Sequence, residues 1–153
     1  MRYSELRTCN SIQQLLPQNP DAVFLLYENS PCNGHWVVLT RDRANNINYF
    51  DSYGGYIDEP LTWETERVNT NMNQDHPYLS CLLDNTPEKT FYNNIDYQGQ
   101  SRKISTCGRH AVMYVHCMLK EMSLEDYYKY MVALKKRCKC SFDDIVCKFI
   151  SRI

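Results

Sequence analysis

Residues 34–51 read GHWVVLTRDRANNINYFD, and they decide the fold because they contain two strands joined by a polar turn. His35 to Thr40 is rich in aromatic and β-branched residues, which favour strands. After the turn of Arg41 to Asn46, Ile47 to Phe50 forms the next strand. A third strand is predicted upstream in the continuous apolar run of Ala22 to Tyr27. The short connections predict a small antiparallel sheet.

Beyond the sheet, the apolar pattern changes to a helical period. From Cys107 onward, apolar residues recur at helical spacing, at Ala111, Val112, Val115, Met118 and Leu119. Ser123 with Asp126, and Ser141 with Asp144, resemble capping boxes that begin two further helices. We therefore predict an α+β fold in which helices flank a small central, mostly antiparallel sheet and Cys107 lies at a helix N-terminus.

The remaining segments carry weaker signals. Tyr3 to Leu16 predicts one or two short helical turns, with Ser11 as an N-cap. Leu61 to Met72 is predicted to be helical. Tyr78 to Leu83 and Phe91 to Tyr97 are predicted as strands.

Composition limits the classes of function. The 153 residues suit a single domain, 1–153, without a linker or repeat, and the net charge of -1 gives no general attraction to nucleic acid or anionic membranes. The basic run Lys135 to Lys139 suits a solvated helix end, with a local anion or DNA contact as the alternative. No apolar run approaches a transmembrane length, and the start MRYSELRTCN lacks the apolar region of a signal peptide. We expect no membrane association.

The eight cysteines are expected to be free thiols in a reducing compartment. Cys138, Cys140 and Cys147 are spaced C-x-C-x6-C, which lacks the paired second half of a usual zinc site. We therefore predict no metal site and interpret these three as ordinary thiols.

Cys107 is the candidate nucleophile. A helix N-terminus stabilises a thiolate and lowers the thiol pKa, and Gly108 would let a substrate backbone approach closely. A buried helix cysteine is the simpler interpretation of a Cys-Gly pair alone. His35 and Asp51 lie at the ends of neighbouring strands, where the histidine could be the general base and the aspartate could accept its Nδ1 proton. Taken separately, a half-buried histidine and a turn aspartate would explain them.

Two further groups complete the predicted site. Gln100, seven residues before Cys107, is a candidate oxyanion donor together with the Cys107 backbone N–H, and Gln98 is its rival. Trp36 could wall a narrow substrate channel or could pack in the core. His110 is a competing base, but its helical position places it poorly, so we interpret Arg109 and His110 as structural or as pocket support.

The motifs together resemble a known family. GHWVVL (Gly34 to Leu39), YFDSYGG (Tyr49 to Gly55), YNNIDYQGQS (Tyr92 to Ser101) and STCGRH (Ser105 to His110) resemble the adenovirus-type cysteine maturation proteases, which are related to the SUMO-specific proteases. The resemblance is strongest to those of virophages, polinton-like elements and large DNA viruses. It implies that His35, Asp51, Gln100 and Cys107 are catalytic, and that Trp36 and Gly108 contact the substrate.

The resemblance also implies a biological role. It implies an endopeptidase that cleaves capsid or virion precursor proteins after Gly-Gly-like sites, in the virion and in the host cytoplasm or viral factory. Relatives are stimulated by a peptide or by DNA, although the sequence itself requires no cofactor and the charge gives no support for nucleic acid. We expect a monomer. The alternatives are an isopeptidase acting on host ubiquitin-like or SUMO conjugates, and an inactive module that binds Gly-Gly tails or virion proteins.

Overall fold

The computed structural model describes residues 1–99 and 105–151. Within these residues there are four strands, six α-helices and two 3-10 helices, η1 (Tyr3–Thr8) and η2 (Glu59–Trp63). The strands are β1 (Asp21–Ser30), β2 (Asn33–Arg41), β3 (Ile47–Phe50) and β4 (Thr90–Tyr92). The α-helices are α1 (Ile12–Leu15), α2 (Glu66–Asn71), α3 (Tyr78–Asp84), α4 (Cys107–Met118), α5 (Leu124–Cys138) and α6 (Phe142–Ile150).

The strands form one sheet in the order β1-β2-β3-β4. β2 pairs antiparallel with both β1 and β3, whereas the short β4 pairs parallel with β3. The start of β2, beside β1, needs Gly34, because a Cβ at this position would lie 1.9 Å from the carbonyl oxygen of Tyr27. The predicted α+β fold with a mostly antiparallel sheet is confirmed.

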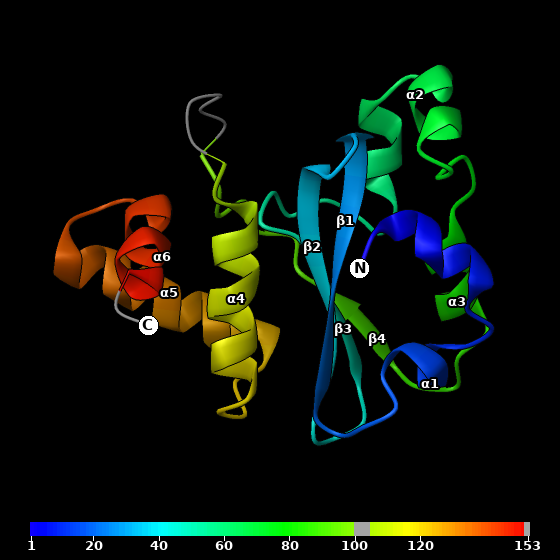
Figure 1. Ribbon diagram of the computed structural model, residues 1–153. Coiled ribbons are helices and arrows are strands. Elements are labelled where there is room, and N and C mark those ends of the chain that lie inside the picture. The colour runs from blue at the N-terminus through cyan, green and yellow to red at the C-terminus, as the bar shows by residue number, and fades with distance from the viewer. Residues whose placement is uncertain (100–104, 152–153) are drawn as a thin grey trace.

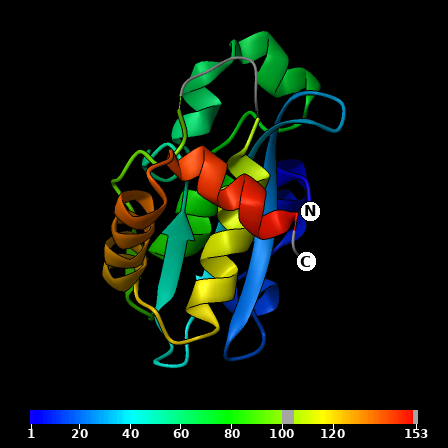
Figure 2. The same ribbon diagram turned by 90° about the vertical axis from the view of Figure 1, so that its left-hand side faces the viewer.

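The sheet is covered on both faces (Figure 1). α4 lies along one face with α5 and α6 beyond it, and η1, α1 and α3 lie on the other side. Turned by 90°, α4 and α6 are seen to cross in front of the sheet (Figure 2). The molecule therefore has three layers, and the C-terminal helices form the outer part of one of them.

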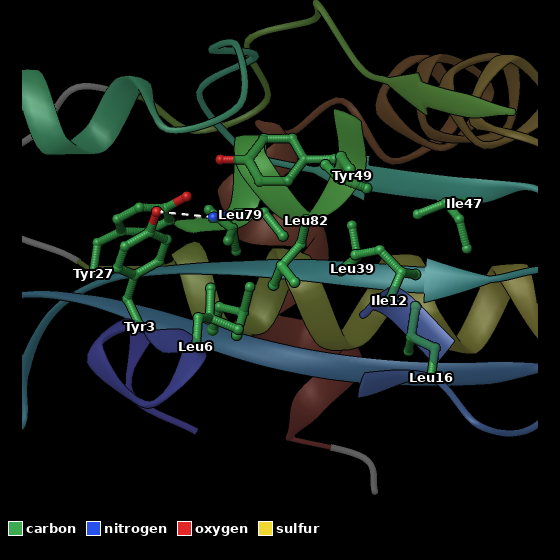
Figure 3. Close-up of a cluster of buried hydrophobic side chains, with 13 residues drawn as sticks. Tyr3, Leu6, Ile12, Leu16, Tyr27, Leu39, Ile47, Tyr49, Leu79 and Leu82 are labelled. Carbon is green, nitrogen blue, oxygen red and sulfur yellow. Dashed lines mark hydrogen bonds between the residues drawn. The ribbon is translucent and has the colours of Figure 1, made fainter. Parts of the chain in front are cut away.

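Two hydrophobic cores result from the alternation of side chains along the strands. Val37, Leu39, Ile47 and Tyr49 point into the core beneath η1, α1 and α3, most of which is drawn in Figure 3. Val38 and Phe50 point into the core beneath α4, α5 and α6, where Phe50 stacks on Tyr114 with ring centroids 4.6 Å apart. Successive residues of β2 and β3 thus pack alternately into the two cores, on opposite faces of the sheet.

Most predicted elements are confirmed. The Ser11 cap accepts a hydrogen bond from the Gln14 backbone, and both predicted capping boxes are formed at α5 and α6. Leu61 to Met72 contains α2 and the end of η2. The strand predicted at Phe91 to Tyr97 is limited to the end of β4, and the strand predicted at Tyr78 to Leu83 is wrong, because these residues form helix α3.

The first turn of α3 is stabilised by residues distant in the sequence. The hydroxyl of Tyr3 accepts a hydrogen bond from the Leu79 N–H at 3.1 Å, and the Asp58 carboxylate accepts one from the Ser80 N–H at 2.9 Å. These groups satisfy N–H donors that a helix N-terminus leaves without intrahelical partners. A local reading of YLSCLL could not include them.

Candidate active site

His35 and Asp51 meet on one face of the sheet. β2 and β3 are paired so that Leu39 lies opposite Tyr49, which places the odd-numbered residues of both strands on the same face. The His35 Nε2 lies 2.8 Å from the Asp51 Oδ1, and both side chains are buried. The predicted contact is present, but the predicted nitrogen was wrong: Asp51 faces Nε2, which leaves Nδ1 available to a thiol.

Asp51 is itself held from two directions. Its Oδ1 also accepts a hydrogen bond from the Tyr53 N–H at 2.8 Å. The Asn93 side chain accepts from the Asp51 N–H at 2.8 Å and donates to the Asp51 carbonyl at 2.7 Å. Asn93 follows β4 directly, so the parallel strand supplies the residue that fixes the backbone of Asp51.

Cys107 is the first residue of α4, as the sequence predicts. α4 packs against the opposite face of β2, and its first turn reaches the end of that strand beside Trp36. There the Trp36 N–H points at the Cys107 Sγ, with the two atoms 3.4 Å apart, and the Ser105 hydroxyl lies 3.6 Å from the same sulfur. Cys107 is only 3% exposed. The sulfur is thus surrounded by donors that stabilise its ionised form.

The two groups that titrate shift in complementary directions. Burial opposes the thiolate, but interaction with His35 and the Trp36 N–H outweighs it and lowers the Cys107 pKa to about 7. Burial likewise opposes the imidazolium, but the hydrogen bond to Asp51 and the interaction with Cys107 raise the His35 pKa to about 9. Between these two values the favoured form is a thiolate beside an imidazolium, which is the reactive form of a cysteine nucleophile.

A cleft of about 210 Å³ opens over this pair. Cys107 and His35 line it together with Tyr53 and Trp63. The Trp63 ring packs on the His35 ring with centroids 5.0 Å apart, on the Tyr53 ring at 5.7 Å, and remains 44% exposed. Trp63 and Tyr53 therefore form an aromatic wall that shields the imidazole and faces the entrance.

Of the two glutamine candidates, only Gln98 lies in the part of the chain that the structure describes. Gln98 lines the cleft with Cys107, and its Oε1 accepts a hydrogen bond from the Ser52 hydroxyl at 2.7 Å. Because Ser52 holds the carbonyl end of the amide, the NH₂ end is the one that can donate to a group in the cleft. Gln100, the predicted donor, lies outside the described residues.

Trp36 and Gly108 lie against each other beside the nucleophile. A Cβ added to Gly108 would meet the Trp36 Cδ1 at 3.6 Å, an ordinary packing distance. Neither residue belongs to the set that lines the cleft, where the exposed aromatic residue is Trp63. Their predicted contact with substrate stays a prediction.

Several residues of the site were not found from the sequence. Trp63 lies at the end of η2, outside the recognised motifs, and Asn93 was quoted only as part of the YNNIDYQGQS motif, without a role. Ser105 was quoted only as part of the STCGRH motif. No local signal marks the roles of Trp63 and Asn93, because each acts through a contact with a distant segment. His110 is buried and its Nε2 lies 2.9 Å from an Asp143 oxygen, in agreement with a structural role.

The surroundings add no further ligand group. Within residues 1–99 and 105–151, no cluster of three His, Cys, Asp or Glu side chains is arranged to hold a metal ion. Across the same residues, no helix combines the length and apolar character needed to cross a membrane. All eight cysteines are free thiols.

Comparison with known proteins gives one sequence relative and one structural neighbour. No family profile matches the chain. The uncharacterized protein V9 of Sputnik virophage is 35% identical over 125 residues, which cover 82% of this chain and 70% of V9. The crystal structure of the ASFV pS273R protease is similar with a TM-score of 0.42 and 24% identity, over 69% of this chain and 35% of that one. The present chain thus spans about a third of that neighbour's length.

Proposed function

The chain belongs to the family of the Sputnik virophage protein V9, and we propose that it is a cysteine endopeptidase in which Cys107, His35 and Asp51 form the catalytic triad. One observation carries this proposal: a thiol of lowered pKa and an imidazole of raised pKa line one cleft, with a buried carboxylate 2.8 Å behind the imidazole. A nucleophile, a base and a group that orients the base are the three parts that acyl transfer requires.

The first half of the reaction forms a thioester. The Cys107 thiolate attacks the carbonyl carbon of the scissile peptide, and the S–C bond forms as the carbonyl oxygen becomes an oxyanion. The Cys107 N–H and the Gln98 amide donate to that oxyanion. His35 then gives its Nδ1 proton to the nitrogen of the leaving amine as the C–N bond breaks.

The second half restores the enzyme. His35, now neutral, accepts a proton from water as the water oxygen bonds to the thioester carbon. The S–C bond breaks, the acid product leaves, and the thiolate forms again beside the protonated imidazole. Asp51 keeps the Nε2 side of the ring occupied throughout, so that Nδ1 carries out both proton transfers.

We propose a substrate class from the size of the cleft and from the resemblance of the sequence motifs to the maturation proteases. A volume of about 210 Å³ is below the roughly 300 Å³ at which pockets for small organic ligands begin, so the cleft suits residues with little or no side chain. This supports cleavage after Gly-Gly-like sites. We further propose that the substrates are virion precursor proteins, cut in the virion or in the host cytoplasm or viral factory, and that no cofactor is obligatory. The virophage origin of the relative V9 supports only the viral part of this proposal.

Selective alkylation tests the reactive thiol. The protein is treated briefly with limiting iodoacetamide across a pH series, and each of the eight cysteines is followed by mass spectrometry. We expect Cys107 to react ahead of the exposed thiols near pH 7, and His35→Ala to abolish this preference. Even alkylation of all thiols would contradict an activated nucleophile.

The chain offers an internal control for this experiment. Cys81 also contacts a histidine, with its Sγ 3.5 Å from the His76 Nε2, but this pair is exposed. His76→Ala should therefore leave the Cys107 reaction unchanged. If His76→Ala and His35→Ala lowered the Cys107 rate equally, the effect would not come from the proposed pair.

Substrate assays separate the proposed role from its rivals. A fluorogenic Gly-Gly peptide should be cleaved by the wild-type protein and not by Cys107→Ala. Cleavage of virion precursors but not of ubiquitin-like fusions supports the maturation role, and the reverse supports an isopeptidase. Binding of Gly-Gly peptides without turnover would indicate the inactive module.

A further inference from the structure

Asp143 in the first turn of α6 joins two segments of the active site. Its Oδ2 accepts a hydrogen bond from the Gly99 N–H at 2.9 Å. Its Oδ1 accepts from the Thr106 hydroxyl at 2.5 Å and from the His110 Nε2 at 2.9 Å. One carboxylate thus receives three hydrogen bonds, two of them from the first turn of the nucleophile helix and the residue before it. Figure 2 shows α6 crossing over α4.

The two segments carry the two proposed oxyanion donors. Gly99 follows Gln98, whose amide lines the cleft, and Thr106 precedes Cys107, whose N–H points out of the helix N-terminus. The Gln98 segment is also held from the sheet side, because the Ser52 carbonyl accepts hydrogen bonds from the N–H groups of Tyr97 and Gln98, at 2.8 and 3.0 Å. Asp143 accepts hydrogen bonds both from this segment and from the nucleophile helix.

The charge states of Asp143 and His110 strengthen the hydrogen bond between them. Partial burial favours a protonated Asp143, but the hydrogen bonds from Thr106 and His110 outweigh it and lower the Asp143 pKa. Burial lowers the His110 pKa against the opposing hydrogen bond to Asp143. A neutral imidazole therefore donates to an ionised carboxylate near neutral pH. This bond is charge-assisted and stronger than one between neutral groups.

We propose that Asp143 is a positioning residue of the proposed protease: it sets the spacing of the Gln98 amide and the Cys107 N–H around the oxyanion. The inference rests on the proposed function and goes beyond it, because it assigns a role in the reaction to the C-terminal helix. Asp143 lines no part of the cleft and acts only through the segments it holds.

This role differs in its consequences from a role in the triad. The His35–Asp51 pair and the Trp36 N–H belong to the sheet, so the thiolate does not depend on Asp143. Loss of the Asp143 carboxylate should loosen the oxyanion donors while leaving the thiol ionised. The donors matter most when charge develops on the oxygen, so the rate of chemistry should fall more than substrate binding.

Asp143→Asn is the variant that tests this. An asparagine has one acceptor oxygen and brings an NH₂ group, so it cannot accept from all three donors. Asp144→Asn is the matched control, because Asp144 is the next residue and is exposed, and it caps α6 through Ser141 without touching either segment. The substrate is a fluorogenic Gly-Gly peptide, and a peptide ending in glycinal reports oxyanion binding through its hemithioacetal.

We expect kcat of Asp143→Asn to fall roughly 10- to 100-fold, below the 10²- to 10³-fold loss from removing a donor outright. Affinity for the glycinal should fall by the same factor, whereas KM and the rate of Cys107 alkylation should stay within about twofold. Asp144→Asn should resemble the wild type in all four. In hydrogen exchange, the Gly99 N–H should lose protection in Asp143→Asn alone.

Other results would distinguish failure of the Asp143 inference from failure of the proposed function. An unchanged kcat in Asp143→Asn, with an active wild type, would overturn this inference and leave the proposed function intact. A parallel fall in alkylation and kcat would mean that the residue only supports folding. If the wild type neither cleaved the peptide nor bound the glycinal, the proposed function itself would fail.

A second variant guards against misfolding of the first. Thr106→Val removes one of the three hydrogen bonds to Asp143 while keeping a similar volume, and Thr106→Ser keeps the hydroxyl. The positioning role predicts that valine lowers kcat and glycinal affinity together and that serine restores both. Equal activity of the two variants would contradict it.

Discussion

At the level of single residues, burial and hydrogen bonding act against each other on the two titrating groups of the cleft. Burial alone would keep Cys107 and His35 neutral, and their mutual interaction with the Asp51 contact reverses this. The reactive pair thus depends on a few specific hydrogen bonds in a site that solvent reaches poorly. Removing one of them should change the pH range of activity before it changes the fold.

The pH dependence of kcat/KM should show this directly. The reactive form needs a thiolate, which is present above the Cys107 pKa of about 7, and an imidazolium, which is lost above the His35 pKa of about 9. We expect a bell-shaped profile with limbs near these values.

Asp51→Asn keeps an acceptor for Nε2 but removes the charge, so the His35 pKa falls. The upper limb of the profile should move down by roughly one pH unit, or about 1.4 kcal/mol. An upper limb that stayed in place would show that Asp51 does not stabilise the imidazolium.

The two glutamines near the nucleophile give a second test. Gln98→Ala removes a proposed oxyanion donor and should lower kcat by roughly 10²- to 10³-fold, with little change in Cys107 alkylation. Gln100→Ala is the matched control and should retain most of its activity. The kcat of each variant is measured on a fluorogenic Gly-Gly peptide. A larger loss of kcat in Gln100→Ala than in Gln98→Ala would identify Gln100 as the oxyanion donor.

At the level of secondary-structure elements, the site depends on where β2 and α4 begin. Gly34 is the second residue of β2, next to His35, and Gly108 is the second residue of α4, next to Cys107. The two glycines have different surroundings: a side chain at Gly34 would collide with the backbone of β1, whereas one at Gly108 would meet only the Trp36 ring. Only the first is required by the fold.

Alanine at these glycines should therefore have different effects. Gly34→Ala would place a Cβ 1.9 Å from the Tyr27 carbonyl oxygen, so the free energy of unfolding should fall by about 1–3 kcal/mol or more. Gly108→Ala should leave stability unchanged or raise it by a few tenths of a kcal/mol, because alanine favours helices. Urea denaturation measures both. A fall in kcat/KM of Gly108→Ala at full stability would support the predicted approach of substrate to this residue, and full activity would argue against it.

At the level of the whole molecule, a buried carboxylate joins parts of the chain that are distant in sequence. Asp58 accepts hydrogen bonds from the hydroxyls of Tyr3 and Tyr27, at 2.7 and 2.8 Å, and from the backbone and side chain of Ser80. The network connects η1, β1 and α3 on the face of the sheet opposite α4. It therefore holds together the layer that faces away from the nucleophile helix.

This network should contribute to stability more than to chemistry. Tyr3→Phe removes the acceptor of the Leu79 N–H and a donor to Asp58, so the free energy of unfolding should fall by about 1–3 kcal/mol. Tyr56→Phe is the control, because Tyr56 is more than half exposed and its change should lie within about 0.5 kcal/mol. Per folded molecule, kcat should be unchanged in both. A similar loss of stability in both variants would mean that the buried network is not the cause.

Local patterns were sufficient for most elements and for the triad candidates. β2 and β3 could be predicted because alternation and β-branched residues are read within one strand, and α4 because its apolar spacing begins at Cys107. His35, Asp51 and Cys107 could be chosen because their motifs occur together in the order of a known protease family, although each residue taken separately had a simpler interpretation. Helix α3 could not be predicted, because Tyr3 and Asp58 supply the partners of its first N–H groups from elsewhere in the chain.

The sequence by itself therefore determined the α+β class and the helix start at Cys107, since both follow from the period and ends of single elements. It also determined the three residues proposed for the triad, through the joint order of their motifs and the family that these motifs resemble. Only the tertiary structure decided that Nε2 of His35 faces Asp51, that Gln98 lines the cleft, and that Trp63 covers the imidazole. It also decided that Asp143 joins the two donor segments. These contacts connect residues far apart in the chain, and their geometry is set by the packing of helices against the sheet, which no local pattern encodes.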